Sequence, residues 1–210
     1  MILKAAHNPT VWPRHRPVVY PGMRIGVLGG SFNPAHDGHL HISSLAIKQL
    51  RLHQIWWLVS PQNPLKSTAG MAAFAKRYAS AQKLAIDPRI EISDLELQFG
   101  TRYTAETLRC IVSRYPGGRF VWLMGADNFL QIPHWQDWQA IFHTMPIGIF
   151  ARAPFETRAR LCKAAQRFWD ARIDPSDADL LPTLKAPAWM FVAGQLHPQS
   201  STALRKKGAA

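Results

Sequence analysis

Two histidines and a pair of glycines lie close together in the segment Gly29-Gly30-Ser31-Phe32-Asn33-Pro34-Ala35-His36-Asp37-Gly38-His39. Glycines let a backbone approach a bound group closely, and imidazoles donate hydrogen bonds to an anion. Because His36 and His39 are three residues apart, both side chains could face one anion at the start of a helix. These residue types predict that residues 29 to 39, the glycine–histidine loop, bind phosphate.

The residues on either side of this loop predict a strand before it and a helix after it. Residues 23 to 28 form a short, mostly apolar run that is typical of a buried parallel strand. The free N–H groups and the dipole of a first helical turn favour an anion. Apolar residues near helical spacing place His39 in that first turn, namely Leu40, Leu45, Ala46 and Leu50.

Two other interpretations of the loop are open. A strand, a glycine pair and a helix occur together in many α/β proteins, so one histidine could be structural. The histidines could also bind a metal ion, but neither an HExxH pattern nor a cysteine cluster accompanies them. We therefore name no metal-ligating residue.

The string Ser31-Phe32-Asn33-Pro34 followed by His36-x-Gly38-His39 resembles the signature of the HxGH nucleotidyltransferases. Within that superfamily, residues 23 to 205 resemble the bacterial nicotinate-nucleotide adenylyltransferases. The resemblance implies adenylyl transfer from ATP to nicotinate mononucleotide, which yields nicotinate adenine dinucleotide and pyrophosphate in NAD biosynthesis. Pantetheine-phosphate adenylyltransferases share similar motifs in shorter chains and remain an alternative.

The resemblance also implies which residues bind ATP. His36 and His39 contact the ATP phosphates, and Lys66 lies near them. Main-chain groups of the loop assist, from Gly29, Gly30, Ser31 and Phe32. The segment from Ser200 resembles the family motif SSTxxR, although Gln199 replaces the usual apolar residue before it. Its phosphate-binding residues are Ser201, Thr202 and Arg205.

Further residues are implied for the ribose and the second substrate. Gly125 and Asp127 resemble the family GxD segment that contacts the ribose hydroxyls of the adenosine. The pocket for the pyridine ring is implied by Thr101, Tyr103, Thr104 and Trp135, and Arg152 is expected to face the mononucleotide phosphate. Mg²⁺ is expected to bind mainly through the ATP phosphates.

Composition sets the broad class. The chain has 210 residues, of which 47% are hydrophobic, and this suits one globular domain. The formal net charge of +12 predicts an acidic partner. A nucleotide qualifies, and so does nucleic acid, which makes a basic nucleic-acid-binding module the rival from another class. The cations are spread along the chain without a recognisable nucleic-acid-binding motif, so we expect no nucleic-acid partner.

The sequence also bears on location. It contains no run of about 18 apolar residues, so we expect no membrane partner. Residues 1 to 22 lack a secretory signal pattern and predict a flexible extension of a cytoplasmic protein. Cys110 and Cys162 form no CxxC pair and are expected to be buried thiols. Residues 23 to 210 are expected to form the nucleotidyltransferase domain, whose oligomeric state the sequence does not indicate.

Apolar runs and helical patterns alternate after residue 22, which predicts an α/β fold with a Rossmann-like, doubly wound parallel sheet. The expected strands are residues 23–28, 55–59, 89–93, 120–124, 147–150 and 189–192. The expected helices include residues 72–86, residues 104–115 with Thr104 as the cap, a segment ending at residue 143 and one opening at Ser200 or Ser201. Residues 170–187 are expected to form a surface loop. Because the candidate motifs follow strands, we expect one cleft at the carboxyl ends of the strands.

Overall fold

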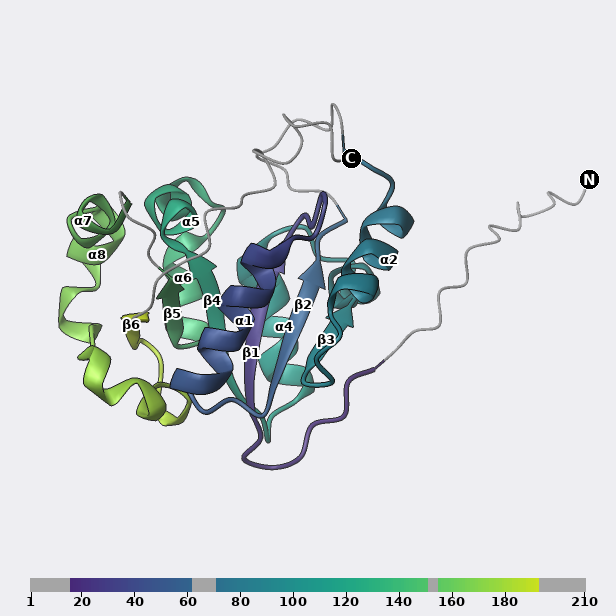
Figure 1. Ribbon diagram of the computed structural model, residues 1–210. Coiled ribbons are helices and arrows are strands. Elements are labelled where there is room, and N and C mark those ends of the chain that lie inside the picture. Colours follow the sequence, from purple (N-terminus) through teal and green to yellow (C-terminus); the bar gives the residue numbers. More distant parts are fainter. Residues whose placement is uncertain (1–15, 62–70, 151–154, 193–210) are drawn as a thin grey trace, which may run out of the picture.

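The computed structural model of the protein describes residues 16–61, 71–150 and 155–192. Six strands form one sheet in the order β3-β2-β1-β4-β5-β6, and all neighbouring strands are parallel (Figure 1). The strands are β1 (Arg24–Gly30), β2 (Gln54–Val59), β3 (Ile90–Ser93), β4 (Arg119–Gly125), β5 (Ile147–Phe150) and β6 (Trp189–Val192). This is the strand order of a doubly wound, Rossmann-like fold, and the predicted fold class is confirmed.

The centre of the sheet fixes where a ligand can bind. Leu28 of β1 lies in register with Trp57 of β2 on one side and Leu123 of β4 on the other. After β1 the chain adds β2 and then β3 on one side of the sheet, and it then adds β4, β5 and β6 on the other side. The direction of strand order therefore reverses between β1 and β4. Open α/β sheets bind ligands outside the carboxyl ends of the strands at such a switch point.

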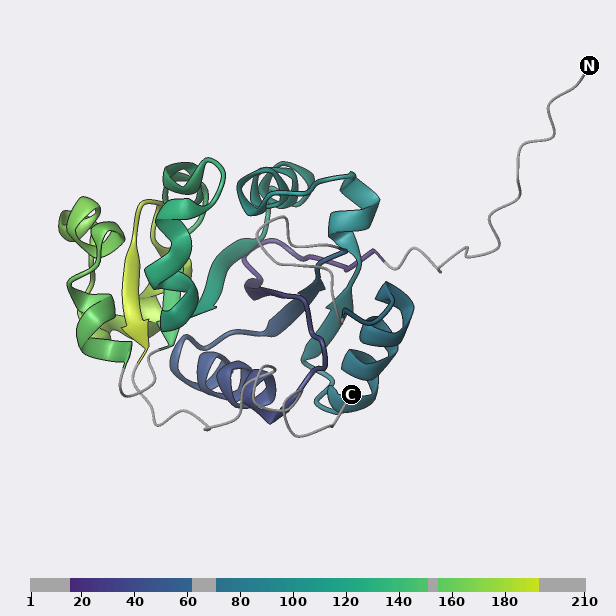
Figure 2. The same cartoon turned by 90° about the horizontal axis from the view of Figure 1, so that it is seen from above.

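Helices cover both faces of the sheet, and Figure 2 shows the two layers from the end of the strands. One face packs against α1 (Asp37–Gln49), α2 (Phe74–Leu84) and the 3-10 segment η3 (Pro175–Thr183). The other face packs against α4 (Thr104–Arg114), α5 (Ala126–Gln131) and α6 (Trp138–Thr144). The shorter elements are α3 (Leu95–Phe99), η1 (Ile132–His134), α7 (Phe155–Arg160), α8 (Lys163–Arg167) and η2 (Trp169–Ala171).

The period-two alternation of a strand explains why the central strands are apolar throughout. In β2, Trp56 faces the core under α4, whereas its neighbour Trp57 faces the core under α1, and both side chains are fully buried. A strand buried on both faces needs apolar residues at every position. The Trp57 indole is also satisfied, because its Nε1–H donates to Ser43 Oγ of α1 at 2.8 Å.

The region predicted as a surface loop, residues 170–187, differs from that expectation. It contains most of η2 and all of η3, and Leu181 is fully buried against the face of the sheet that α1 covers. The polar and proline-rich sequence predicts a loop, because only a few apolar side chains of this segment, such as Ala178, pack against the sheet.

The two cysteines also differ from the prediction. Cys110 and Cys162 are free and only partly buried.

The last residues of the predicted N-terminal extension contact the domain. Pro17 is buried, and Val19 packs against the core on the α4 side of the sheet. The main-chain N–H of Gly22 donates to the carbonyl of Gly117 at 2.8 Å. These contacts lie just before β4, at the amino ends of the strands.

Candidate active site

The glycine–histidine loop leaves the carboxyl end of β1 and enters α1 at His36. His36 is the N-cap of α1, and its Nδ1 accepts a hydrogen bond from the main-chain N–H of Gly38 at 3.1 Å. His39 makes the reciprocal contact, since its Nδ1 accepts from the main-chain N–H of His36 at 3.2 Å. The two histidines therefore form a capping box in which imidazole nitrogens replace the usual oxygen acceptors.

This cap determines which nitrogen of each imidazole can donate. A ring nitrogen that accepts a hydrogen bond carries no proton, so each neutral ring holds its proton on Nε2. The two ring centroids lie 4.0 Å apart. Each Nε2–H is a hydrogen-bond donor, and such donors suit the oxygens of a polyphosphate.

Aromatic packing holds His39 in place. The Phe32 ring lies 4.6 Å from the His39 ring and stacks on Trp57 at 5.1 Å. Phe32 has a φ of 45°, which is uncommon for a residue with a side chain. Its ring is almost completely buried, so packing offsets the cost of this backbone conformation.

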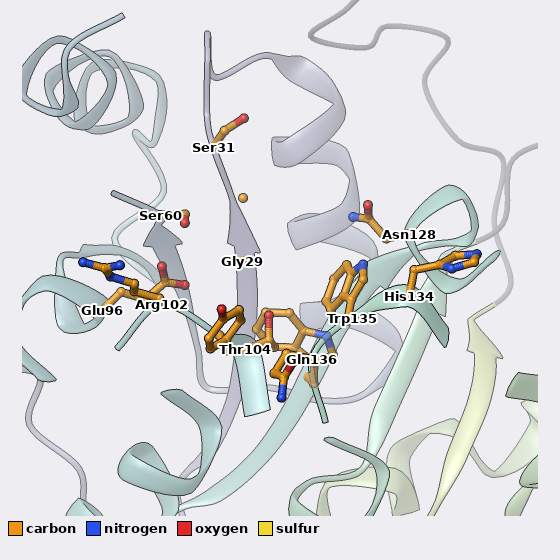
Figure 3. A pocket seen from close by; sticks show the side chains of 13 residues that line it. Gly29, Ser31, Ser60, Glu96, Arg102, Thr104, Asn128, His134, Trp135 and Gln136 are labelled. Carbon is orange, nitrogen blue, oxygen red and sulfur yellow. The ribbon is translucent and has the colours of Figure 1, made fainter. Parts of the chain in front are cut away.

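A pocket of about 270 Å³ opens at the carboxyl end of β1, beside the glycine–histidine loop (Figure 3). Predicted site residues from three separate segments line it, namely Gly29, Gly30, Ser31, Tyr103, Thr104 and Trp135. The indole of Trp122 lies directly against the main chain of β1, since a Cβ added to Gly29 would meet Trp122 Cη2 at 2.4 Å. Glycine is therefore needed at residue 29 for this close approach.

The amino end of α4 faces this pocket. Thr104 is the first residue of α4, and the N-cap is Tyr103, one residue before the predicted cap. The Tyr103 side chain makes no capping hydrogen bond, whereas Thr101 supports the turn through Oγ1, 2.8 Å from Thr107 Oγ1. N–H groups of a first helical turn have no acceptor within the helix. This end of α4 thus presents donors and a positive dipole to the pocket.

Sequence reasoning missed other residues that line the pocket. They are Ser60, Glu96, Trp122, Asn128, His134 and Gln136. Arg102, which also lines the pocket, lies between the predicted residues Thr101 and Tyr103. Ser60 directly follows β2 and Glu96 follows β3 by three residues, so the rule that ligand-binding residues follow strands could have found both.

Glu96 is the titratable group in this pocket with the most perturbed environment. Burial raises the pKa of Glu96 from 4.5 to about 7, although a hydrogen bond with Ser60 and the positive charge of Arg77 lower it. Figure 3 shows Glu96 near Ser60, on the opposite side of β1 from Asn128 in this view. A carboxyl group with such a pKa changes its charge near neutral pH.

Gly125 and Asp127 lie at the carboxyl end of β4, on the other side of the switch point. Asp127 is exposed on the first turn of α5, and its carboxylate folds back over the preceding main chain. A Cβ added to Gly125 would lie 2.4 Å from Asp127 Oδ1, so glycine leaves room for this conformation.

Several predicted site residues lie outside the described residues. They are Lys66, Arg152, Ser201, Thr202 and Arg205. Within the part of the chain that the structure describes, no three His, Cys, Asp or Glu side chains gather as a metal site. No helix among these same residues is long and apolar enough to cross a membrane.

Comparison with known proteins shows similarity along most of the chain. Residues 27–207 match the model of the cytidylyltransferase-like family. The chain is 53% identical over 193 residues to a probable nicotinate-nucleotide adenylyltransferase of Parvibaculum lavamentivorans, covering 92% of this chain and 96% of the relative. It is 47% identical over 185 residues to the protein of the same name in Methylorubrum extorquens, covering 88% of this chain and 100% of that relative.

Solved structures share the fold. The nicotinic acid mononucleotide adenylyltransferase of Plasmodium falciparum, in complex with NaAD, superimposes with a TM-score of 0.62 at 21% sequence identity. The superposition covers 88% of this chain and 83% of the Plasmodium chain. The same enzyme in complex with APC gives a TM-score of 0.61 at 20% identity and the same coverage.

Proposed function

The chain belongs to the cytidylyltransferase-like family, and we propose that it transfers the adenylyl group of ATP to nicotinate mononucleotide. The products are nicotinate adenine dinucleotide and pyrophosphate. A phosphate oxygen of the mononucleotide attacks the α-phosphorus of ATP and forms the new P–O bond. The bond between the α-phosphorus and the bridging oxygen to the β-phosphate breaks, and that oxygen leaves with pyrophosphate.

The observation that carries this proposal is the histidine cap of α1. Phosphoryl and nucleotidyl transfer need positioning and stabilisation of negative charge more than covalent help from the protein. In the proposed mechanism the Nε2–H groups of His36 and His39 donate to ATP phosphate oxygens, which lowers the cost of charge on the leaving pyrophosphate. Because Nδ1 of each ring is held by a main-chain N–H, the donors are oriented before ATP binds.

The pocket beside the loop is proposed to bind the mononucleotide. The amino end of α4 at Tyr103 and Thr104 receives the pyridine carboxylate, with Thr101 supporting the turn. The Trp135 indole provides a flat surface on which the pyridine ring stacks. These elements distinguish the proposal from a pantetheine-phosphate adenylyltransferase, whose acceptor has neither an aromatic ring nor a carboxylate.

The remaining predicted roles are retained as proposals. Asp127 binds the ribose hydroxyls of the adenosine, and Lys66 contacts the ATP phosphates. The SSTxxR segment supplies further phosphate ligands through Ser201, Thr202 and Arg205. Arg152 faces the mononucleotide phosphate. The roles of Asp127, Lys66 and the SSTxxR residues rest on the family motifs, and that of Arg152 rests on its position in the sequence, two residues after β5.

Mg²⁺ is proposed to arrive with ATP as part of the substrate. The groups that the loop turns toward the phosphates are N–H donors, which bind oxygen atoms rather than a cation. Mg²⁺ keeps several waters and is commonly held by substrate phosphates. Bound in this way, it neutralises part of the triphosphate charge.

The test is pyrophosphate release from MgATP with each acceptor in turn. We expect release with nicotinate mononucleotide and none above background with 4′-phosphopantetheine or without an acceptor. Release with 4′-phosphopantetheine alone would contradict the proposal and favour the alternative acceptor.

A further inference from the structure

Arg77 of α2 is buried inside the site region although it carries a charge. Its side chain is 2% exposed, and it is among the largest fully buried side chains of the described residues. Burial lowers the pKa of Arg77, and the negative charge of Glu96 opposes that effect. Removing a guanidinium from water costs several kcal/mol, on the order of the stability of a whole domain, unless its donors are satisfied.

The Arg77 donors are satisfied by main-chain carbonyls. Nε donates to Ala72 O at 2.9 Å, and Nη2 donates to Pro61 O at 2.9 Å. Nη1 donates both to Ser31 O at 2.5 Å and to Ser60 O at 2.8 Å. One side chain thus joins the glycine–histidine loop, the end of β2 and the start of α2.

The bond to Ser31 bears on phosphate binding. A peptide unit is planar and trans, so its C=O and the following N–H point in opposite directions. By holding the Ser31 carbonyl from inside the protein, Arg77 turns the N–H of Phe32 the other way. Phe32 then packs against His39, so the same peptide unit connects Arg77 to the histidine cap.

Arg77 also connects this loop to the wall of the neighbouring pocket. Glu96 lines the pocket, interacts with the Ser60 hydroxyl and attracts the Arg77 charge. An apolar residue in place of Arg77 would leave the part-buried carbonyls of Ser31 and Ser60 without these hydrogen bonds.

We propose that Arg77 is a positioning residue for adenylyl transfer, because it fixes the main chain of the glycine–histidine loop in the orientation that ATP phosphates require. This inference rests on the proposed function and adds a residue to it. Arg77 contacts no substrate; it acts through the Ser31 carbonyl.

The test compares Arg77→Lys and Arg77→Met with the wild type, and Phe142→Leu serves as a control for lost stability. Phe142 stacks on Phe168 with ring centroids 4.0 Å apart on the opposite face of the sheet. Each variant is assayed below its own melting temperature for kcat and for the KM of both substrates.

We expect kcat to fall about a hundredfold in Arg77→Met, since a small misplacement of reacting groups has an effect of that order. Arg77→Lys keeps the charge and three donors, so it should recover part of the loss. The KM for nicotinate mononucleotide should change less than kcat does, because Arg77 does not itself line the mononucleotide pocket and reaches it only through Ser31, Ser60 and Glu96. Phe142→Leu should keep the wild-type kcat.

Wild-type kcat in either Arg77 variant, or a loss no greater than that of Phe142→Leu at equal stability, would overturn the proposal. An equal change in both KM values with kcat unaltered would also overturn it. If Arg77→Met does not fold, Arg77→Lys decides the question. Failure of the proposed function is distinguishable from failure of the Arg77 proposal, because in that case the wild type itself would release no pyrophosphate.

Discussion

At the scale of single residues, the two histidines of the loop are placed by hydrogen bonds that leave only one tautomer for each neutral ring. His39 accepts through Nδ1 from the main chain of His36, and His36 accepts from that of Gly38. The sequence pattern predicted that both residues lie at a helix start. It could not predict that the imidazoles cap the helix themselves, because capping by histidine depends on backbone angles set by the preceding loop.

His39→Ala should reduce kcat by about a hundredfold to a thousandfold, the usual effect of losing one oriented donor to a transition-state charge. His53→Ala is a matched control. Its Nδ1 also accepts a main-chain hydrogen bond, from Arg24 at 2.9 Å, but it lies before β2 at the amino end of the sheet. Steady-state kinetics and thermal melting of both variants check the prediction. Equal kcat in the two variants would refute the role of His39.

Glu96 should make stability depend on pH. Its pKa is raised from 4.5 to about 7 in the folded protein, so the folded state holds the proton more tightly than the unfolded state. The contribution of this group is most favourable below pH 4.5 and is lost as the pH rises through about 7. Glu96→Gln removes this dependence.

We measure the free energy of unfolding of the wild type and of Glu96→Gln with urea. As the pH rises from 5 to 8, the stability of Glu96→Gln relative to the wild type should increase by about 2 kcal/mol. Comparing the difference between the two proteins at each pH cancels the titration of the other groups. A difference that is constant over this range would contradict the raised pKa.

At the scale of elements, the switch point between β1 and β4 gathers the glycine–histidine loop, the start of α5 and the start of α4. Strand positions and the doubly wound fold were predictable because apolar runs of strand length alternate with helical patterns. Short elements were not. α3 has five residues, too few for a periodic pattern, and yet it places Glu96 in the pocket. η3 was predicted as loop because its polar and proline-rich sequence outweighs its few buried residues.

The amino end of α4 should favour an acid over an amide. A carboxylate accepts from several helix N–H groups, whereas an amide brings an NH₂ group that faces donors. An unsatisfied buried donor costs about 1–3 kcal/mol, so we expect kcat/KM for nicotinate mononucleotide to exceed that for nicotinamide mononucleotide by about tenfold to a hundredfold. Side-by-side kinetics with both acceptors measure the ratio. Equal values would refute this pocket assignment and leave the phosphate site of His36 and His39 standing.

At the scale of the whole molecule, the candidate site and the contacts of residues 17 to 22 lie at opposite ends of the strands. The domain boundary predicted after residue 22 remains a prediction, but Pro17 and Val19 contact the domain near the amino ends of the strands. The carboxyl ends hold the candidate site. Contacts of residues 17 to 22 were not predictable, because two apolar side chains in a short, proline-containing segment form no periodic pattern.

A chain beginning at Met23 should therefore be less stable than one beginning at Arg16 and equally active. Losing the buried surface of Pro17 and Val19 should cost about 1–2 kcal/mol, which lowers Tm by about 2–8 °C for a protein of this size. Calorimetry and kcat on the two chains test this. A loss of kcat in the shorter chain that persists well below its Tm would show that residues 16 to 22 influence the site.

The proposed reaction yields two products, and their stoichiometry tests it directly. The full chain is incubated with MgATP and nicotinate mononucleotide, and nicotinate adenine dinucleotide and pyrophosphate are quantified over time. Adenylyl transfer requires that both products appear together in a one-to-one ratio. Pyrophosphate without the dinucleotide, or folded protein that forms neither product, would contradict it.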